Sequence, residues 1–575
     1  MDYDCKEWFV WLFGGLGATI VAALLGWIIR LFWKKYNQKE QLVSISNNGK
    51  ENTGIALNNA PLNNSPFGNT FHININNYYL GSDCKNGDTQ NTKKVFGRLM
   101  YREIDSDIKK EQTTSSDSVE LYLQKAEQGD PEAQFCLGVC YWNGKCLEKN
   151  PVKAVEWWSK AAKQGHSAAQ YNFGCSYIYG KGIEQNSQKA FEWFNRSAQS
   201  GFAPAQHSLG MCYKNGEGVV ADLGMALEWF TKSAQQGDAM AQMALGCCYY
   251  FGEGVEKNDA EAVEWFHKSA TQGYEGGQFL LGFCYYHGSG VVKNDKKAFE
   301  WVKKAAEQGD SLAQYHMGAS YREGTGVQQD DKKAFEWYLM SAEQGLGVAQ
   351  YTVGVCYYEG DGVEKNLFSG FSWVKKAAEQ GHAEAEYNTG VNYRNGNGVE
   401  QNIDEGYKWM IKSAEHGFVL AQLLLADMFF QGIEVDENKV IGIDWYRKAA
   451  EQGHMRAQNN LGVIYYNGDG VTRDVAEAVK WYKKSAEQGF VMSQFSLGDC
   501  YDRGDGVVPN AMESARWYLA AAEQGHIDAQ YRIACFYEEG HGVEKDMTQA
   551  IDWYRKAAEQ GYPQAVADLN RLEPK

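Results

Sequence analysis

Hydrophobic residues follow two patterns along the chain, one near the amino terminus and one that recurs as far as the carboxy terminus. The first is Trp8–Ile29, a run of 22 residues without a charge. It is long enough for a helix to cross a hydrocarbon core of about 30 Å, and tryptophans lie near both of its ends, as is typical of membrane interfaces. This pattern predicts a short tail at residues 1–7 and a transmembrane helix with a basic flank at residues 8–33.

The charges on either side of this run are asymmetric. Acidic residues precede the run, whereas Arg30, Lys34, Lys35 and Lys39 follow it. The positive-inside rule therefore predicts an amino terminus outside the membrane and a large cytoplasmic part after the helix. A cleaved signal peptide is the alternative, but its apolar region would be shorter and its basic residues would come first.

Small residues form a stripe on the predicted transmembrane helix. Gly14, Ala18, Ala22 and Gly26 are four residues apart and share one face. Such stripes let helix backbones approach each other in lipid, so these residues are candidates for association between two chains. The alternative is that glycine and alanine are simply frequent in membrane helices.

Residues 34–112 form a polar neck that is rich in Asn, Gly and Ser. This composition cannot bury a core, so we expect a flexible tether. Phe71–Asn76 (FHININ) departs from the pattern because its apolar and polar residues alternate, as in a strand. It is either a short pairing segment or an accidental run within the tether.

The second hydrophobic pattern repeats every 36 residues. Thirteen glycines keep this interval without an insertion, from Gly129 and Gly165 to Gly561, and they bound twelve units. We number the units 1 to 12 and count positions from the glycine that precedes each unit. The pattern predicts twelve repeats over residues 131–561, a capping helix at 113–130 and a capping half-repeat at 562–575.

Each unit contains two amphipathic segments that predict a pair of helices. Helix A carries the frame A-Q-x-x-L-G-x-x-Y, and helix B carries A-x-x-W-x-x-x-(S/A)-A. A glycine recurs at position 9 in the middle of helix A, which indicates close contact with a neighbouring helix. The tryptophan at position 28, such as Trp229, is expected to pack between the two helices. Two glycines in the loop and the QG after helix B predict tight turns.

These frames, together with the G-x-G-V loop, resemble the Sel-1-like repeat family, a relative of the tetratricopeptide repeats. The resemblance covers about four-fifths of the chain, from Val119 to Lys575. It implies an all-α fold, a right-handed superhelical solenoid of helix–turn–helix repeats. It also implies a role as an adaptor or scaffold for protein complexes.

Composition and motifs exclude several functions. The net charge is −17 and no basic stripe occurs in the repeats, which argues against binding to nucleic acid. There is no zinc-protease, Walker A or nucleophile-elbow motif, and the G-x-G loops lack the preceding strand that dinucleotide binding needs. We therefore predict a non-enzyme with no catalytic residue, cofactor or metal. Four histidines at the starts of helices A (His166, His382, His454, His526) are not assigned to an active site.

Thirteen cysteines raise the question of disulfides or zinc. Six of them share position 11 of helix A, near its core face, and are predicted to be small core residues. Some members of the resembled family join helix A to helix B with a disulfide. Here no helix B contains a cysteine, which argues against such bonds and fits a reducing compartment. Cys136, Cys140 and Cys146 are close enough in sequence for a zinc site, which we disfavour.

The units differ most at position 13 of helix A, which lies opposite the face that holds the Ala and Leu of the frame. Aromatic residues and arginines dominate protein interfaces, and first helices usually line the concave surface of such solenoids. The sequence therefore nominates a partner-binding groove centred on Tyr250 to Arg394. Its candidate residues are Trp142, Tyr250, Tyr286, Arg322, Tyr358, Arg394, Phe430 and Tyr466. Aromatic residues also recur at position 6, where we favour packing between adjacent helices A.

Two functions fit these features. The first is a membrane-anchored scaffold that recruits a protein or peptide partner on the concave face of its repeats. The second is a self-oligomerising structural or sensor protein, for example a regulatory or defence protein, assembled through the transmembrane helix and the neck.

Overall fold

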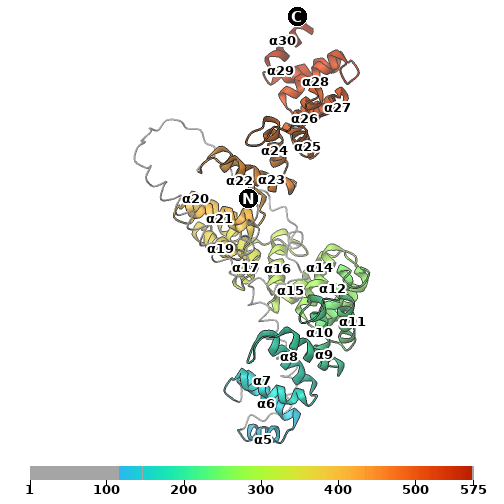
Figure 1. Cartoon of the computed structure of the whole chain (residues 1–575), viewed down its shortest axis with the longest axis vertical. Helices are drawn as coiled ribbons and strands as arrows, with labels where there is room; N and C mark the ends of the chain where they lie inside the picture. Colours follow the sequence, from blue (N-terminus) through green and yellow to red (C-terminus); the bar gives the residue numbers. More distant parts are fainter. Residues whose placement is uncertain (1–115, 145–146, 434, 573–575) are drawn as a thin grey trace, which may run out of the picture. The chain divides into compact units, whose positions relative to one another are not determined.

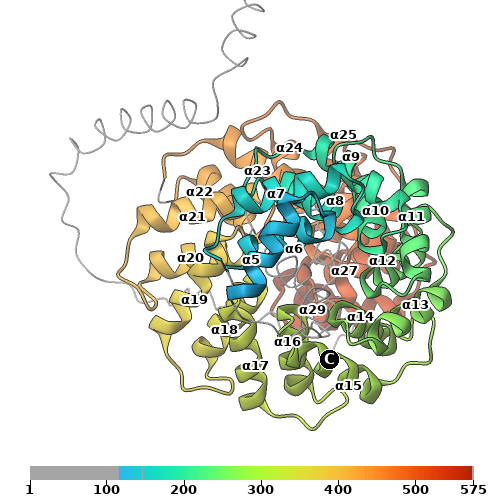
Figure 2. The ribbon, with the colours of Figure 1, turned by 90° about the horizontal axis from the view of Figure 1, so that it is seen from below.

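The computed structural model describes residues 116–144, 147–433 and 435–572, which form 26 α-helices and no strand. Figure 1 shows these helices joined by short loops in chain order, and Figure 2 shows the hairpins following one another from α5 onward. The predicted all-α array of twelve units is confirmed for this part of the chain.

Every unit contains an even-numbered helix A and an odd-numbered helix B. The A helices are α6 (Pro131–Asn143), α8 (Ser167–Tyr179), α10 (Ala203–Asn215), α12 (Ala239–Phe251), α14 (Glu275–His287), α16 (Ser311–Glu323), α18 (Gly347–Glu359), α20 (Ala383–Asn395), α22 (Val419–Gln431), α24 (Met455–Asn467), α26 (Val491–Arg503) and α28 (Ile527–Glu539). The B helices are α7 (Pro151–Lys163), α9 (Ser187–Gln199), α11 (Leu223–Gln235), α13 (Asp259–Thr271), α15 (Asp295–Glu307), α17 (Asp331–Glu343), α19 (Leu367–Glu379), α21 (Ile403–Glu415), α23 (Lys439–Glu451), α25 (Val475–Glu487), α27 (Ala511–Glu523) and α29 (Met547–Glu559).

Single helices flank the twelve hairpins. The first, α5 (Ser116–Glu127), packs against α6, and the last, α30 (Pro563–Leu572), packs against α29. Leu121 of α5 stands where the units carry tryptophan, and it is 51 % exposed because no further helix B covers it. Each of these helices therefore has one packed side and one open side, as expected of caps on a repeat array.

The glycine at position 9 allows helix B to approach helix A closely. A Cβ atom on Gly210 would lie 2.6 Å from the Phe230 ring and 3.2 Å from the carbonyl oxygen of Ala226. We expected Trp229 to be the main ring between the two helices, but the ring that lies against the glycine is that of the next residue, Phe230. One residue turns a helix by about 100°. Trp229 therefore faces away from the glycine and is half-buried beneath Lys232, whose Nζ lies 4.2 Å from the ring centroid.

An Asn or Asp at position 21 begins every helix B. In unit 2, the side chain of Asn186 accepts a hydrogen bond of 2.9 Å from the backbone N–H of Lys189, which otherwise lacks a partner within the helix. Helix A ends at a glycine in the left-handed conformation, such as Gly216 with a φ of 71°. These two caps fix the length of the loop between the helices.

The second glycine of the loop joins neighbouring units. Gly218 in unit 3 has a φ of 73°, and a Cβ atom on it would lie 2.2 Å from the carbonyl oxygen of Ser187. Ser187 is the first residue of α9 in unit 2. The loops that carry this second glycine therefore rest on the start of the preceding helix B, and only glycine leaves room for this contact.

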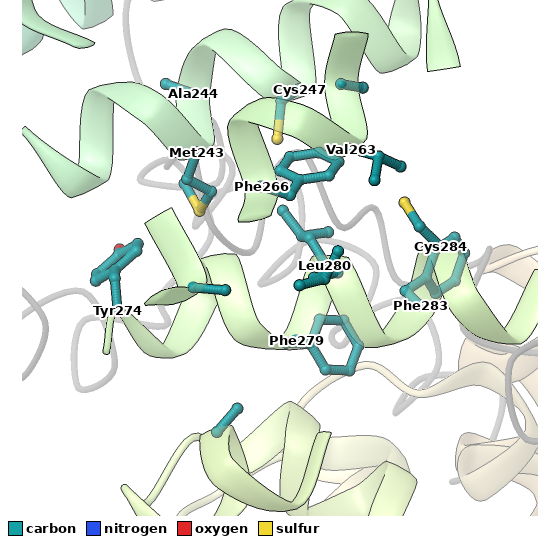
Figure 3. Packing of buried hydrophobic residues seen from close by; sticks show 14 of the residues in the cluster. Met243, Ala244, Cys247, Val263, Phe266, Tyr274, Phe279, Leu280, Phe283 and Cys284 are labelled. Carbon is teal, nitrogen blue, oxygen red and sulfur yellow. The ribbon is translucent and has the colours of Figure 1, made fainter. Parts of the chain in front are cut away.

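The hydrophobic core runs continuously from unit to unit. In Figure 3, Cys247 of α12 and Leu280 of α14 point toward each other, with Phe266 of α13 beside them. Five of the six cysteines at position 11 are buried, and Cys140 is half-buried. Burial raises the pKa of the Cys284 thiol to about 12, so it stays protonated. The prediction that these cysteines belong to the core is confirmed.

Among the described residues, no helix is both long and apolar enough to cross a membrane. The predicted transmembrane helix at Trp8–Ile29, with its candidate association residues Gly14, Ala18, Ala22 and Gly26, lies outside these residues. The neck and the first three residues of the predicted capping helix, 113–115, also lie outside them.

Candidate binding surfaces of the array

Two glutamines in most units form a relay that joins three successive helices. In unit 4, Gln242 donates from Nε2 to the carbonyl oxygen of Ala234 in α11, at 3.2 Å. Gln272, at the end of α13, donates from Nε2 to Oε1 of Gln242, at 2.7 Å. Ten units contain this Gln–Gln hydrogen bond. The glutamine of the recurrent QG is therefore a structural residue.

Units 2 and 8 depart from this relay. In unit 2 the closing residue is Ser200, and Oε1 of the buried Gln170 has no hydrogen-bond partner in the described structure. In unit 8 both glutamines are replaced, and Nδ1 of His416 lies 2.7 Å from Oε2 of Glu386. Glu386 is only 2 % exposed. Unit 8 therefore buries a carboxyl group where the other units bury an amide.

The aromatic residues at position 6 pack against the next unit. The Tyr351 ring stacks on His382 with centroids 5.0 Å apart, and the Phe495 ring stacks on His526 at 4.5 Å. Each histidine is the first residue of the following unit. The prediction that position 6 serves packing between adjacent helices A is confirmed.

The structure places the eight candidate residues at position 13 on the same flank, and all are half-buried. Several contact the loop of the next unit, 39 residues further on. Arg322 forms an ion pair of 3.5 Å with Asp361, and the Tyr466 hydroxyl donates to Asp505 at 2.8 Å. Lys214, at position 13 of unit 3, pairs with Glu253 in the same way.

The other candidates make similar local contacts. Trp142 lies 5.2 Å from the Trp158 ring, and the Tyr358 hydroxyl accepts a hydrogen bond of 2.8 Å from Asn392. Lysines lie over the rings of Tyr250, Tyr286 and Phe430. Position 13 therefore lines the boundary between units. Partner contact by these residues, Arg394 included, stays a prediction.

A different set of positions lies farthest from helix B. The glycine at position 9 faces helix B, and the helical turn of about 100° per residue places positions 3, 7, 10 and 14 between about 100° and 160° away from it. We call the side chains at these four positions the A-face. From unit 8 to unit 12, position 3 of the A-face is exposed and differs in every unit. Its residues there are Glu384, Leu420, Arg456, Met492 and Asp528.

In units 4 to 6, positions 7 and 10 of the A-face are buried, whereas position 14 is exposed. Cys247 is 1 % exposed, Leu280 4 % and Phe283 2 %. The helices α12 and α14 contact each other directly, although they belong to different units. Positions 7 and 10 of these units therefore contribute to the core, whereas the exposed row at position 3 lies in units 8 to 12.

Comparison with known proteins shows what kind of array this is. The Sel1 repeat family matches the chain at residues 131–166, 167–202, 203–238, 239–274, 276–310, 311–346, 347–382, 383–418, 419–454, 456–490, 491–526 and 527–562. The chain belongs to the Sel1 repeat family. A search of the curated proteins found no match.

Two solved structures of Sel1-like repeat proteins are similar to this Sel1 repeat protein. One is c5321, a protective antigen present in uropathogenic Escherichia coli strains. It is 33 % identical, has a TM-score of 0.50, and the match covers 80 % of this chain and 98 % of c5321. The other is a Sel1 repeat protein from Oxalobacter formigenes. It is 32 % identical with a TM-score of 0.43, and the match covers 54 % of this chain and 89 % of that one.

Solenoids of the Sel1 type typically mediate contacts between proteins and are generally non-catalytic. Within the described Sel1 repeats, no group of three or more His, Cys, Asp or Glu side chains is arranged to hold a metal ion. Cys136 and Cys140 are half-buried, and Cys146 lies outside the described residues. The burial of Cys136 raises its pKa to about 12.

The four histidines at the starts of helices A cap the Sel1 repeats. Nδ1 of His382 accepts a hydrogen bond of 3.2 Å from the backbone N–H of Ala385. His166, His454 and His526 make the same contact with their own helices. Sequence analysis placed these residues at helix starts but missed their capping role. Their recurrence at one position in four units, as alternatives to Asp, was the signal for it.

Proposed function

We propose that this Sel1 repeat protein is a membrane-anchored scaffold that recruits a protein partner through the A-face of units 8 to 12. Trp8–Ile29 would span the bilayer with the repeats in the cytoplasm, as the flanking charges indicate. The repeats would display the partner at the membrane without carrying out chemistry on it.

The observation that carries this proposal is the exposed row at position 3. The units share most of their residues because those residues pack in the core, cap the helices or form the glutamine relay. Position 3 is free of these tasks in units 8 to 12, where Leu420 is 49 % exposed and Met492 52 %. Arg456 stands between them and pairs with Asp427 at 2.9 Å. Exposed apolar side chains with interspersed charges are typical of surfaces that bind proteins.

We include residues at position 13 in the proposed binding surface. Phe430 and Tyr466 lie near the other ends of the helices that carry the exposed row. We propose that they extend the surface on which a partner rests, because contacts with Tyr446 and with Asp505 respectively fix them before binding. Fixed side chains lose little conformational entropy when a partner binds.

Co-purification with the full-length chain tests the binding surface. We expect the substitutions Leu420→Asp and Met492→Asp together to reduce recovery of the partner at least tenfold, measured by quantitative mass spectrometry. The matched control is Val220→Asp with Val508→Asp, because these valines are 86 % and 83 % exposed in loops outside the A-face. Equal loss with both pairs, or recovery unchanged by the first pair, would refute the assignment.

A second experiment tests the anchor separately. Removal of residues 8–29 should move the chain from the membrane fraction to the soluble fraction while it keeps its partner. A chain that stays in the membrane fraction after this removal would contradict the proposed span. Labelling of Cys84 from each side of the membrane tests the orientation, and reaction from the outside would contradict a cytoplasmic location of the repeats.

A further inference from the structure

The starts of the B helices in units 7 to 9 carry exposed apolar side chains. Phe368 is 75 % exposed, Val440 71 % and Ile403 52 %, and Leu367 and Ile441 are exposed beside them. We call these five residues the edge patch. They lie in the first turns of α19, α21 and α23, far around the hairpin from the A-face.

Single exposed apolar residues also occur at the starts of other B helices, such as Val152, Leu223 and Met512, but five gather in units 7 to 9. At position 22, the first residue of helix B, units 4 to 6 carry Asp259, Asp295 and Asp331. An aspartate there is favoured because it interacts with the positive end of the helix dipole. Leu367 and Ile403 at the same position lack this interaction, and they remain 44 % and 52 % exposed. Burial within the chain therefore covers only about half of these apolar side chains.

The edge patch continues from one unit to the next. A Cβ atom on Gly398 would lie 2.1 Å from the carbonyl oxygen of Leu367 and 3.1 Å from the backbone nitrogen of Phe368. The loop of unit 8, which leads into Ile403, therefore rests on the start of α19. In unit 9, Ile433 in the equivalent loop is 45 % exposed and adds to the apolar area.

Carboxylates surround this apolar surface. Glu364, Glu400, Asp404 and Asp436 are exposed in the same loops and first turns, and no ion pair joins them to a basic group among the described residues. Lys365 offsets one of these charges, whereas Lys439 is paired with Glu437 at 3.6 Å. The rim of the edge patch is therefore acidic.

We propose that the edge patch binds a basic amphipathic segment of a partner protein. Its apolar side chains would cover Phe368, Ile403 and Val440, and its Lys or Arg side chains would pair with the rim carboxylates. Amphipathic helices dock on such surfaces through apolar side chains three and four residues apart. The opposite charge of the rim selects a basic partner and excludes an acidic one. This surface is separate from the A-face and extends the proposed scaffold to a second ligand.

Two synthetic peptides provide the probes. Both have the same length and place leucine at i, i+3 and i+4, but one fills the remaining positions with lysine and the other with glutamate. Binding is measured by fluorescence anisotropy with the full-length chain in nanodiscs of neutral lipid, and empty nanodiscs are the blank. We expect the Leu/Lys peptide to bind at least tenfold more tightly than the Leu/Glu peptide. Equal affinity for the two peptides would overturn the proposal.

Substitutions then locate the site. Phe368→Ser with Val440→Ser should raise the Kd of the Leu/Lys peptide at least tenfold without changing the charge. The matched control, Val220→Ser with Val508→Ser, removes two equally exposed valines elsewhere and should leave the Kd unchanged. Binding that survives the first pair, or that both pairs weaken equally, would overturn the assignment to the edge patch.

Charge reversal tests the rim, and mass measurement tests the nature of the occupant. Glu400→Lys with Asp436→Lys should shift the preference toward the Leu/Glu peptide, and an unchanged preference would overturn the role of the rim.

If sedimentation shows a dimer that Phe368→Ser dissociates, a second copy of the chain occupies the edge patch, and the proposal of a basic partner is overturned.

Discussion

His382 shows how one side chain holds two units together. Its Nδ1 accepts a hydrogen bond from the start of α20 in unit 8, and its ring stacks on Tyr351 of unit 7. The hydrogen bond requires an unprotonated Nδ1. Burial of the ring lowers the pKa of His382 below its usual value of 6.5, which keeps Nδ1 available as an acceptor near neutral pH.

This capping contact predicts a pH-dependent stability. Because the folded chain binds the His382 proton less readily than the unfolded chain, the contribution to stability is complete above about pH 6.5 and is lost as the pH falls through the lowered pKa. In His382→Asn the cap does not titrate. When the pH is lowered from 7.5 to 5, we expect the free energy of unfolding, measured with urea, to fall by about 1 kcal/mol more in the wild type than in this variant. Equal changes between pH 7.5 and pH 5 in both chains would contradict the capping role.

Position 13 shows what a single sequence can and cannot predict about a residue. The spacing places Arg322 opposite Ala313 and Met317, the buried frame residues of its helix. In an isolated amphipathic helix that side would face water. In an array it faces the next unit, where Arg322 finds Asp361. Spacing indicates which side chains share a face, but it does not indicate what covers that face.

At the scale of elements, the contact between a loop and the start of the preceding helix B restricts which residues fit in the loop. Gly201 and Gly218 both have a positive φ, so both resist substitution for conformational reasons. Only Gly218 also lies against another backbone, at the start of α9, whereas nothing lies within 4 Å of a Cβ atom on Gly201.

The two glycines therefore form a matched pair for mutagenesis. Gly201→Ala should cost about 1–2 kcal/mol for the left-handed conformation alone. Gly218→Ala should cost at least about 2 kcal/mol more, because the loop must move away from Ser187. The free energies of unfolding from urea titrations measure both effects. Similar costs for the two variants would show that the loop does not rest on α9 in solution.

Sequence patterns predicted the elements better than their contacts. The repeat period, the order of the helices and the close approach of helix B to helix A at Gly210 all follow from residues that recur at fixed positions. The ring opposite that glycine was assigned to Trp229 because tryptophan occurs in every unit, yet Phe230 occupies the contact. Position 29 varies among aromatic, aliphatic and Met residues, so its importance was hidden. Side chains of different shapes fit at position 29 because the glycine at position 9 has no side chain to clash with them.

At the scale of the array, the contacts described above link each unit to its neighbours. The bond from Gln242 to Ala234, the stacked rings and the loop contacts each connect one unit with the unit before or after it. Such an array is stabilised by the sum of its units and of the interfaces between them.

This arrangement predicts that whole units can be removed. Deletion of residues 239–274 removes α12 and α13 and lets Gln278 donate to Ala234 as it now donates to Ala270. We expect a folded chain with a melting temperature lower by a few degrees, about 2–4 °C. Deletion of residues 239–256 removes α12 but leaves α13 without its partner helix. This control should show a broad transition and bind a hydrophobic dye. If both deletions melt alike, the unit of 36 residues is not the unit of stability.

The glutamine relay also has a mechanical consequence. Because the relay passes from helix to helix in series, a pulling force applied between the two ends of the array would load every unit equally. Elongation would then begin at the interface that yields at the lowest force. Unit 2, where Ser200 leaves Oε1 of Gln170 without a hydrogen bond, is the unit that the relay reinforces least. In unit 8 the contact between Glu386 and His416 takes the place of the bond between the two glutamines.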